Sequence, residues 1–232
     1  ALTCPVTEIV LQDNPALHLI TTHEEDAAAS HLASREARLA RDSRLHCHTI
    51  TLGGGLVRSD VNVALEAEGA HASLSGLSVT DGNQHVDNQV RVHHRAPLCT
   101  SEQQYRGILD GASRAVFTGR IVVDRDAQKT DARQSNRNLI LSDDALAHSN
   151  PQLEILADDV RCTHGSTVGR LDEDALFYLQ SRGLDRAAAQ SLLTYAFASE
   201  IVQTIGVGEV RARVERALTS RLPRGELLRE TA

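Results

Sequence analysis

Apolar and polar residues alternate in short segments through the middle of the chain. The segment LHCHTITL covers residues 45–52, and VNVALEAE, at residues 61–68, places Val61, Val63 and Leu65 on one face. The alternation continues in QVRVHH, AVFTGRIVV and NLILS, with Gly, Asn and Asp between the segments. Alternation with a period of two is typical of β-strands, and the intervening residues are typical of turns. The pattern predicts β-structure from about residue 44 to residue 165.

Three of these segments resemble one another. GAHASLSGL begins at residue 69, GASRAVFTGR at residue 111 and DDVRCTHGS at residue 158, so their starts lie 42 (111−69) and 47 (158−111) residues apart. Repeats of this length indicate stacked units that cannot bury their apolar faces alone. We interpret each period as two rungs of a β-solenoid, with two or three short strands per rung. A β-sandwich with coincidental similarity is the alternative, and the aromatic content of 3% favours the thin aliphatic layers of a solenoid.

Two other regions have helical features. Residues 23–41, HEEDAAASHLASREARLAR, are rich in helix-favouring Ala, Glu and Arg, although HLASREARLA also alternates as a strand does. After Gly169 the segment LDEDALFYLQSRGL has Asp172 as a candidate N-cap and Gly183 as a candidate C-terminal stop. A second helix is predicted to begin at Asp185, and a third is VRARVERALTSRL. The pattern predicts a β body followed by helices.

Composition restricts the classes of protein to which the chain can belong. Its 24 Lys and Arg residues against 31 Asp and Glu give a net charge of -7, which argues against a nucleic-acid partner. No apolar run approaches the ~20 residues of a membrane span. The four cysteines lie far apart with no CxxC pair, which favours a reducing compartment. The absence of Met and the strand-like opening suggest a fragment or a processed product.

Four long runs of sequence carry a resemblance to a known family. They are ITLGGGLVRSDVNVALEAEGA, LSVTDGNQHVDNQVRVHH, YRGILDGASRAVFTGRIVVDRDAQKTDARQSNRNLILSDDA and PQLEILADDVRCTHGSTVGRLDEDALFYLQSRGL. They resemble the SufB/SufD family of iron–sulfur cluster assembly proteins, and the SufD branch more than the SufB branch. The resemblance implies a mainly β fold: a right-handed parallel β-helix (β-solenoid) over residues 1–168, followed by a C-terminal helical domain over 169–232. It implies strands in 23–41 and a missing N-terminal part of the native chain.

The same resemblance implies a SufD-like scaffold subunit that performs no covalent catalysis. Such a subunit pairs with a SufB-like subunit, or with a second copy of itself, and binds a SufC-like ATPase through its C-terminal helices. The complex builds a nascent cluster, so transient iron or an Fe–S cluster is expected at the subunit interface. The compartment would be the cytoplasm, or the plastid stroma in a photosynthetic eukaryote.

Cys162 and His164 are the candidate metal ligands. Residues two apart in a strand point to the same side, and a thiolate and an imidazole are both reasonable ligands for iron. Two side chains cannot complete a tetrahedral shell, and the alternative is that both face a solenoid seam or a partner strand. The resemblance places His164 at the interface with SufB. Where SufB has a cysteine and a glutamate, this chain has Asn136 and Gly165, so we expect that it does not accept sulfur.

Other histidines and cysteines are weaker candidates. His93 and His94, which follow His85 in HVDNQVRVHH, point to opposite faces of a strand, so we interpret these residues as exposed solenoid histidines. In the HCH segment at 46–48 the two histidines share one face and the cysteine lies on the other. Cys99 is expected to be a free thiol. The glycines of LGGGL, residues 52–56, lack the setting of a phosphate loop and fit a tight corner, so no nucleotide is expected on this chain.

The predicted helices hold most of the aromatic residues of the chain. These residues and their apolar neighbours are a candidate docking surface for the ATPase, and the alternative is that they form an internal core. The set is Leu176, Phe177, Tyr178, Leu192, Leu193, Tyr195 and Phe197.

Two other functions remain open from the sequence. A β-helix carbohydrate-active enzyme would need several acidic residues in a cleft and aromatic platforms for sugars, and we find no defensible pair of carboxylates on neighbouring rungs. A purely structural homodimer with no metal role is the second alternative.

Overall fold

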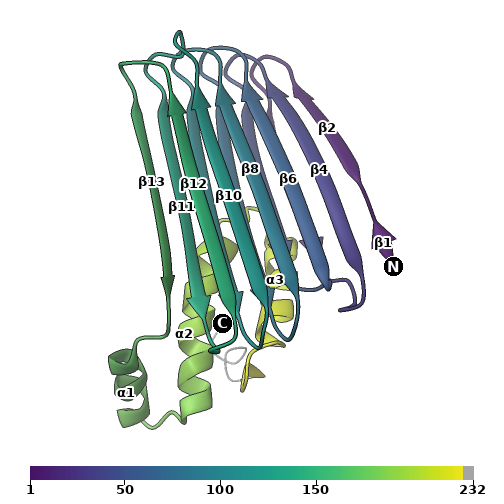
Figure 1. Cartoon of the computed structure of the whole chain (residues 1–232), viewed down its shortest axis with the longest axis vertical. Coiled ribbons are helices and arrows are strands. Elements are labelled where there is room, and N and C mark those ends of the chain that lie inside the picture. The colour runs from purple at the N-terminus through teal and green to yellow at the C-terminus, as the bar shows by residue number, and fades with distance from the viewer. Residues whose placement is uncertain (227–232) are drawn as a thin grey trace.

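A stack of parallel strands with helices on one side makes up the computed structural model, which describes residues 1–226 (Figure 1). The strands are β1 (Leu2–Thr3), β2 (Val6–Leu11), β3 (Ala16–His23), β4 (Ser30–Leu39), β5 (Arg44–Thr51), β6 (Leu56–Leu65), β7 (His71–Thr80), β8 (His85–His94), β9 (Thr100–Leu109), β10 (Arg114–Val123), β11 (Asp131–Ile140), β12 (Leu146–Ile155) and β13 (Arg161–Gly169). One sheet contains the odd-numbered strands from β3 to β13, and the other contains β1, β2 and the even-numbered strands. The chain passes from one sheet to the other and back, so the predicted β-solenoid is confirmed.

One turn of the solenoid is shorter than the sequence repeat suggested. His71, Thr100, Asp131 and Arg161 are successive register partners, 29, 31 and 30 residues apart. The offsets of 42 and 47 residues relate segments of opposite sheets and correspond to about one and a half turns. The interpretation of each period as two rungs was therefore wrong. The number of strands per rung, two, lies within the expected two or three, but these strands are longer than predicted.

Residues 23–41 contain the end of one strand, a turn and a whole second strand, as the family resemblance implied, and the helical alternative was wrong. His23 ends β3, and residues 30–39 form β4, which pairs along its whole length with β6. Every second residue of β4 from His31 to Leu39 is buried, and the residues between are more exposed. Pairing on both edges and burial of this face outweigh the helix propensity of Ala, Glu and Arg.

The core consists of columns in which equivalent side chains stack from rung to rung. In the even-numbered sheet, Ala37, Val63, Val92 and Ile121 are register partners, and all four are buried. Full burial of a Val or Ile side chain contributes about 1.5–3 kcal/mol. Because the register repeats, each column adds this contribution once per turn.

The Tyr105 ring enters this largely aliphatic interior where a glycine makes room for it. Tyr105 packs against Phe117, with the ring centroids 5.0 Å apart. Gly76 is the register partner of Tyr105, and a Cβ atom at Gly76 would lie 2.3 Å from two atoms of the tyrosine ring. The small residue on β7 and the large one on β9 therefore fill one space together.

Three helices follow the strands within residues 1–226: α1 (Glu173–Ser181), α2 (Arg186–Val202) and α3 (Gly208–Thr219). Asp172 caps α1 by accepting a hydrogen bond from the Asp174 amide, and Asp185 caps α2 by accepting one from Ala188. Gly183, with φ of 95°, lies between the two helices and adopts the left-handed conformation that glycine tolerates best. The predicted caps and stop are confirmed. No helix in this described part of the chain is long and apolar enough to cross a membrane.

Helices α2 and α3 pack on the outer face of the odd-numbered sheet. Arg106 of β9 donates to the Phe197 carbonyl at 2.8 Å and pairs with Glu200 of α2. The apolar contact joins strand residues to helix residues, namely Ile50, Leu52, Leu77, Ile108 and Leu139 with Ala198, Ile201, Val202, Ile205, Val214 and Leu218. The helices and the sheet thus share a core. A functional division at residues 168 and 169 stays a prediction, and positions 227–232 lie outside the described residues.

We predict that Gly76→Ala destabilises the chain by about 1–3 kcal/mol, because the added methyl group overlaps the Tyr105 ring. Urea denaturation measures the change. Gly165→Ala is the matched control, since a Cβ atom there meets no atom of the described residues within 4 Å. Equal stability of the two variants would contradict the packing described here.

We predict that acid destabilises the folded chain, because His94 is wholly buried between Leu65 and Val123 of the neighbouring strands. Burial, followed by the charge of His93, lowers the pKa of His94 from 6.5 to about 4. Between these pH values the histidine binds a proton in the unfolded chain but not in the folded chain. As the pH is lowered from 6.5 to about 4, the free energy of unfolding should therefore decrease, by up to about 3 kcal/mol from this residue. Below about pH 4 this loss of stability should level off.

His94→Gln should flatten this dependence, as measured by urea denaturation at several pH values. The control is His148→Gln, at an exposed position of β12. If the free energy of unfolding of His94→Gln depends on pH as steeply as that of the wild type, the folded chain accepts the proton at this position without penalty.

Candidate functional site

The last strand, β13, lies at the end of the solenoid (Figure 1). Within residues 1–226 it pairs with β11 on one edge, and its other edge has no strand partner. Cys162 is the register partner of Ala132, and His164 that of Gln134. Ala132 and Gln134 are both buried inside the solenoid. Cys162 and His164 therefore lie on the same, inward side of β13, as their spacing predicts, and no further rung of the described chain covers them.

The two side chains differ in their surroundings. Cys162 is half-buried and packs against an apolar cluster that includes Ile121, Val123 and Ala132. Burial raises the pKa of the Cys162 thiol, and the Asp131 carboxylate raises it further. The thiol is therefore protonated at neutral pH and must lose its proton to bind a metal. His164 is exposed.

A polar column leads through the interior to His164. Gln103, Gln134 and His164 are successive register partners, and the Gln134 amide donates to Gln103 Oε1 at 2.7 Å. Both glutamines are buried, and within the described residues Gln134 Oε1 and Gln103 Nε2 have no hydrogen-bond partner. Further back the same column contains Leu74 and Cys47. This column thus changes from apolar to polar toward the end that exposes His164.

Asn136 and Gly165 lie on different faces. Asn136 is buried in the interior, where its amide donates to the Tyr105 carbonyl at 3.3 Å and its Oδ1 accepts from Asn138 at 2.8 Å. Gly165 lies on the outer face of β13, in open space among the described residues. The Asn136 side chain therefore holds neighbouring strands together through its amide, at a position where a cysteine would place a thiol.

His93 and His94 point to opposite sides of the sheet, as predicted. His93 lies outside, 2.9 Å from the Asp124 carboxylate, whereas His94 lies inside and contacts the Ser101 hydroxyl at 2.8 Å. The interpretation of both as exposed histidines was wrong, since His94 is fully buried. Cys99 is a buried free thiol that donates to the Ala67 carbonyl at 3.2 Å.

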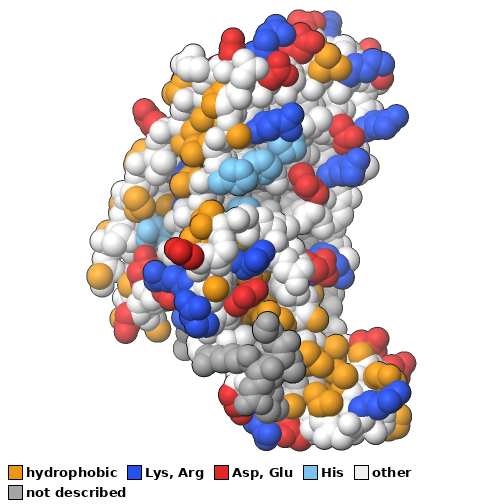
Figure 2. Space-filling model, turned by 180° about the vertical axis from the view of Figure 1, so that it is seen from behind, with side chains coloured by type: hydrophobic (Ala, Val, Ile, Leu, Met, Phe, Trp, Pro, Cys, Tyr) orange, Lys and Arg blue, Asp and Glu red, His pale blue; other side chains and the backbone are white. Residues whose placement is uncertain are grey.

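The HCH segment forms part of a histidine stack. His46 lies between His18 and His71, with ring centroids 4.5 and 5.7 Å away, while Cys47 is buried on the opposite face. His48 contacts the Thr204 hydroxyl after α2 at 2.9 Å. Figure 2 shows histidine side chains gathered on the face that carries the helices. Burial, with the neighbouring histidines, lowers the pKa of His46 and disfavours several positive charges in one stack.

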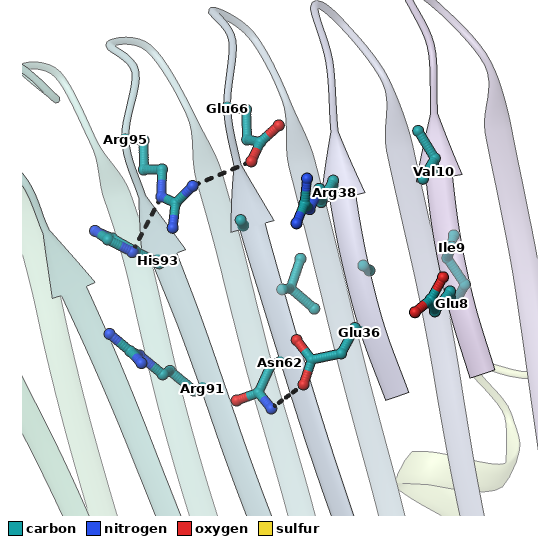
Figure 3. Close-up of a pocket in the computed structure, with 13 residues that line it drawn as sticks. Glu8, Ile9, Val10, Glu36, Arg38, Asn62, Glu66, Arg91, His93 and Arg95 are labelled. Atoms are coloured by element: carbon teal, nitrogen blue, oxygen red, sulfur yellow. Dashed lines mark hydrogen bonds and ion pairs between the residues drawn. The ribbon is translucent and has the colours of Figure 1, made fainter. Parts of the chain in front are cut away.

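A hollow of about 560 Å³ lies on the outer face of the even-numbered sheet (Figure 3). Arg95 pairs with Glu66 at 3.1 Å, and Asn62 donates to Glu36 at 2.6 Å. Glu8 and Glu36 are register partners, so two carboxylates do lie on neighbouring rungs, contrary to the sequence analysis. No Phe, Tyr or Trp side chain lines this hollow in the described chain.

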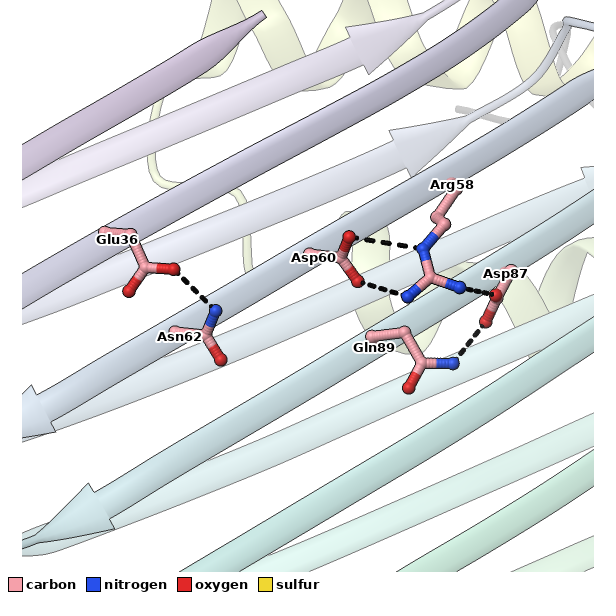
Figure 4. A network of polar contacts seen from close by, with 6 residues as sticks. All are labelled: Glu36, Arg58, Asp60, Asn62, Asp87 and Gln89. Atoms are coloured by element: carbon pink, nitrogen blue, oxygen red, sulfur yellow. Dashed lines mark hydrogen bonds and ion pairs between the residues drawn. The ribbon is translucent and has the colours of Figure 1, made fainter. Parts of the chain in front are cut away.

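The same sheet face carries an ion-pair network next to the hollow (Figure 4). Arg58 binds Asp60 of its own strand at 3.0 Å and Asp87 of the next strand at 2.8 Å, and Gln89 donates to Asp87 at 2.7 Å. These groups satisfy one another at the surface, where such pairs contribute about 0–1 kcal/mol. The network therefore fits a role in fixing side chains along the strands.

Comparison with known proteins identifies the family. Residues 1–197 match the family model described as SUF system FeS cluster assembly, SufBD core domain. The chain belongs to the SufBD family. It is 35% identical over 212 residues to the iron–sulfur cluster assembly protein SufD of Escherichia coli (strain K12), covering 91% of this chain and 50% of that protein.

Other SufBD relatives show similar agreement. Identity is 38% over 200 residues with the SufBD family protein ML0594 of Mycobacterium leprae, covering 83% of this chain and 51% of the relative. It is 33% over 210 residues with the protein ABCI7, chloroplastic, of Arabidopsis thaliana, covering 90% and 44%. The chain spans about half the length of these curated relatives.

The set of candidate metal ligands on β13, at the end of the solenoid, is incomplete. Cys162 and His164 supply one sulfur and one nitrogen, and iron in such a soft environment takes four ligands. The pair can hold an ion or a cluster as cargo when further ligands come from outside the described residues. Sequence analysis missed a second group, His23, Glu25 and His31, which lies at a corner near the other end of the stack.

Proposed function

We propose that this chain is a SufD-like scaffold subunit that assembles nascent iron–sulfur clusters together with a SufB-type subunit and a SufC-type ATPase. The observation that carries the proposal is the position of Cys162 and His164 on β13, at the uncovered end of the solenoid. Family membership supplies the chemistry in which these donors would act.

The free edge of β13 supports a partner at this end. An edge strand presents unpaired backbone groups that a second chain can use for strand pairing. Such a partner would also cover His164 and bring the missing ligands to it. The partner is a SufB-type subunit in the assembled complex, and a second copy of this chain can occupy the same edge in isolation.

A non-catalytic role agrees with the chemistry of the site. The Cys162 thiol has a raised pKa and is therefore a weak nucleophile at neutral pH. Asn136 places an amide in the interior. Sulfur transfer and ATP hydrolysis would then belong to the partners, and this chain would orient the growing cluster.

Helix α1 supports the docking of the ATPase. On α1 the Leu176 side chain is buried, whereas Phe177 and Tyr178 are 73% and 56% exposed. Exposed adjacent aromatic side chains are typical of protein interfaces. The rest of the predicted surface is partly used internally, because Tyr195 and Phe197 pack beside the core shared with the sheet.

The alternatives account for less of the structure. A carbohydrate-active enzyme could use Glu8 and Glu36, but the hollow beside them lacks aromatic platforms among the described residues. A purely structural homodimer would leave the polar column that leads to His164 without a purpose. We propose the cytoplasm, or a plastid stroma, as the compartment, and the chloroplastic relative supports the second possibility.

We predict that His164→Ala leaves the complex intact and lowers its iron and acid-labile sulfide content by about 10-fold or more, because one cluster ligand is lost. The full-length protein is co-expressed with SufB-type and SufC-type partners, and iron and sulfide are assayed after purification. His148→Ala, at an exposed position of β12, is the control. Normal cluster content in His164→Ala would refute the proposed role.

We also predict that Phe177→Ser combined with Tyr178→Ser weakens binding of the ATPase by about 30-fold or more, the effect of losing an aromatic hot spot of ~2 kcal/mol. Titration of the purified SufC-type partner measures the affinity. The control is Leu146→Ser, which removes an exposed apolar side chain from β12. Unchanged affinity in the double variant would move the docking surface away from α1.

A further inference from the structure

Two histidines and a glutamate converge at the corner between β3 and β4. His23 is the last residue of β3, His31 is the second residue of β4, and Glu25 lies in the turn between them. Each residue offers a ligand atom, and these three atoms lie within 4.8 Å of one another. His23 and His31 are 2% and 7% exposed, and the Glu25 side chain is 29% exposed. The cluster is thus enclosed, with the carboxylate at its solvent edge.

Three polar atoms of this cluster are buried without partners. They are Nε2 of His23, Nε2 of His31 and Oε2 of Glu25, none of which has a hydrogen-bond partner within the described residues. A buried polar atom that loses its hydrogen bond costs about 1–3 kcal/mol. Three such atoms in one cluster indicate that a bound species completes the site.

The hydrogen bonds of His31 leave a lone pair for such a species. Its Nδ1 lies 3.0 Å from Glu25 Oε1 and 2.6 Å from the Thr3 hydroxyl. Because an ionised carboxylate only accepts, the ring proton belongs on Nδ1, and Nε2 is then an unprotonated nitrogen. Metal-binding histidines commonly donate their other ring N–H to a nearby acceptor. When the Glu25 carboxylate turns to the ion, the Thr3 hydroxyl remains as the acceptor of this proton.

The charge balance of the cluster includes a buried arginine. Arg35 is buried nearby, where its guanidinium donates to the Thr49 and Ser59 hydroxyls at 3.3 and 3.0 Å. Arg35 opposes a cation, so the negative charge of Glu25 is needed to offset it.

We infer that His23, Glu25 and His31 form a binding site for one divalent transition-metal ion. Two imidazoles and a carboxylate are a donor set that suits Zn²⁺ or Fe²⁺, with water in the fourth position. Ligands at 2.0–2.1 Å in a tetrahedron lie about 3.4 Å apart, so a group spread over up to 4.8 Å has to contract on binding. Rotation of the partly exposed Glu25 side chain supplies part of this contraction.

The neighbouring corner holds the turn in place. Gly53 and Gly55 lie against it so closely that a Cβ atom would stand 2.4 Å from the Glu25 carbonyl oxygen and 2.2 Å from that of Ala27. The Gly54 amide donates to the Glu25 carbonyl at 2.8 Å. The glycines of LGGGL therefore act at a tight corner, as predicted, and they fix the backbone that carries Glu25.

The site also lies next to the helical layer. Glu24, beside Glu25, pairs with Arg213 of α3 at 3.2 Å. An ion at the corner would join β3, the turn and β4, and would steady the residue that α3 contacts. This site lies on the first rungs of the described chain, whereas Cys162 and His164 lie on the last, so the two assignments stand or fall separately.

Metal binding to the purified chain, freed of metal with EDTA, tests the inference with Zn²⁺ and Co²⁺ as probes. We expect one equivalent of Zn²⁺ to remain after gel filtration, and Co²⁺ to give the visible absorption of a four-coordinate ion. His31→Gln should weaken Zn²⁺ binding by at least about 100-fold, since loss of a supporting residue alone costs about 10–100-fold. Glu25→Gln, at the solvent edge, should weaken it as well.

His18→Gln and His148→Gln are the controls, since these histidines lie outside the cluster and outside the Cys162–His164 pair, and both should keep the bound ion. Thermal unfolding provides a second readout: Zn²⁺ should raise the midpoint of the wild type and of the controls, but not that of His31→Gln. Circular dichroism in EDTA checks that each variant is folded. Absence of a bound equivalent in the wild type, or Zn²⁺ binding as tight as that of the wild type in Glu25→Gln and His31→Gln, would overturn the assignment.

Discussion

In-register pairing of parallel strands is the constraint on which this molecule depends. It places equivalent residues above one another on every turn, so the surroundings of an inward side chain are largely set by the residues before and after it in its column. Ala37, Val63, Val92 and Ile121 show the usual result, a continuous aliphatic stack. At the last rung one of the two neighbours is absent from the described chain, and an inward position becomes a surface position. His164 is exposed for this reason and not because its strand is irregular.

Local patterns were sufficient for the strands and the helix caps. The alternation in LHCHTITL and the capping residues Asp172 and Asp185 depend on neighbours a few residues away, which a single sequence displays. Residues 23–41 were ambiguous, because their helix propensity is local while pairing with β6 is not. The length of one turn was also misjudged, since the similar segments belong to opposite sheets and share only their turn chemistry.

The two candidate sites differ in the same way: one follows from local spacing, and the other depends on residues far apart in the sequence. Cys162 and His164 are two residues apart, so their shared face follows from strand geometry. His23, Glu25 and His31 span a corner whose shape depends on Gly53 and Gly55 of the next rung, and HEED in isolation reads as an ordinary polar turn. The stack of His18, His46 and His71 is equally invisible without the strand pairing that brings His18 and His46, 28 positions apart, and His46 and His71, 25 positions apart, into contact.

Helices α2 and α3 pack mainly against the middle of the stack, on buried residues from β5 to β11, with Ile20 of β3 at the margin of this contact. In a linear array each rung is stabilised by its neighbours and by whatever lies on its faces, so the free energy needed for local opening is greatest in the middle and falls toward the ends. Backbone amides of β7 and β9 should then exchange with solvent far more slowly than those of β13. In the proposed scaffold role, a rung that opens at little cost would let Cys162 and His164 adjust to the shape of a growing inorganic core, while the middle rungs keep the rest of the molecule rigid.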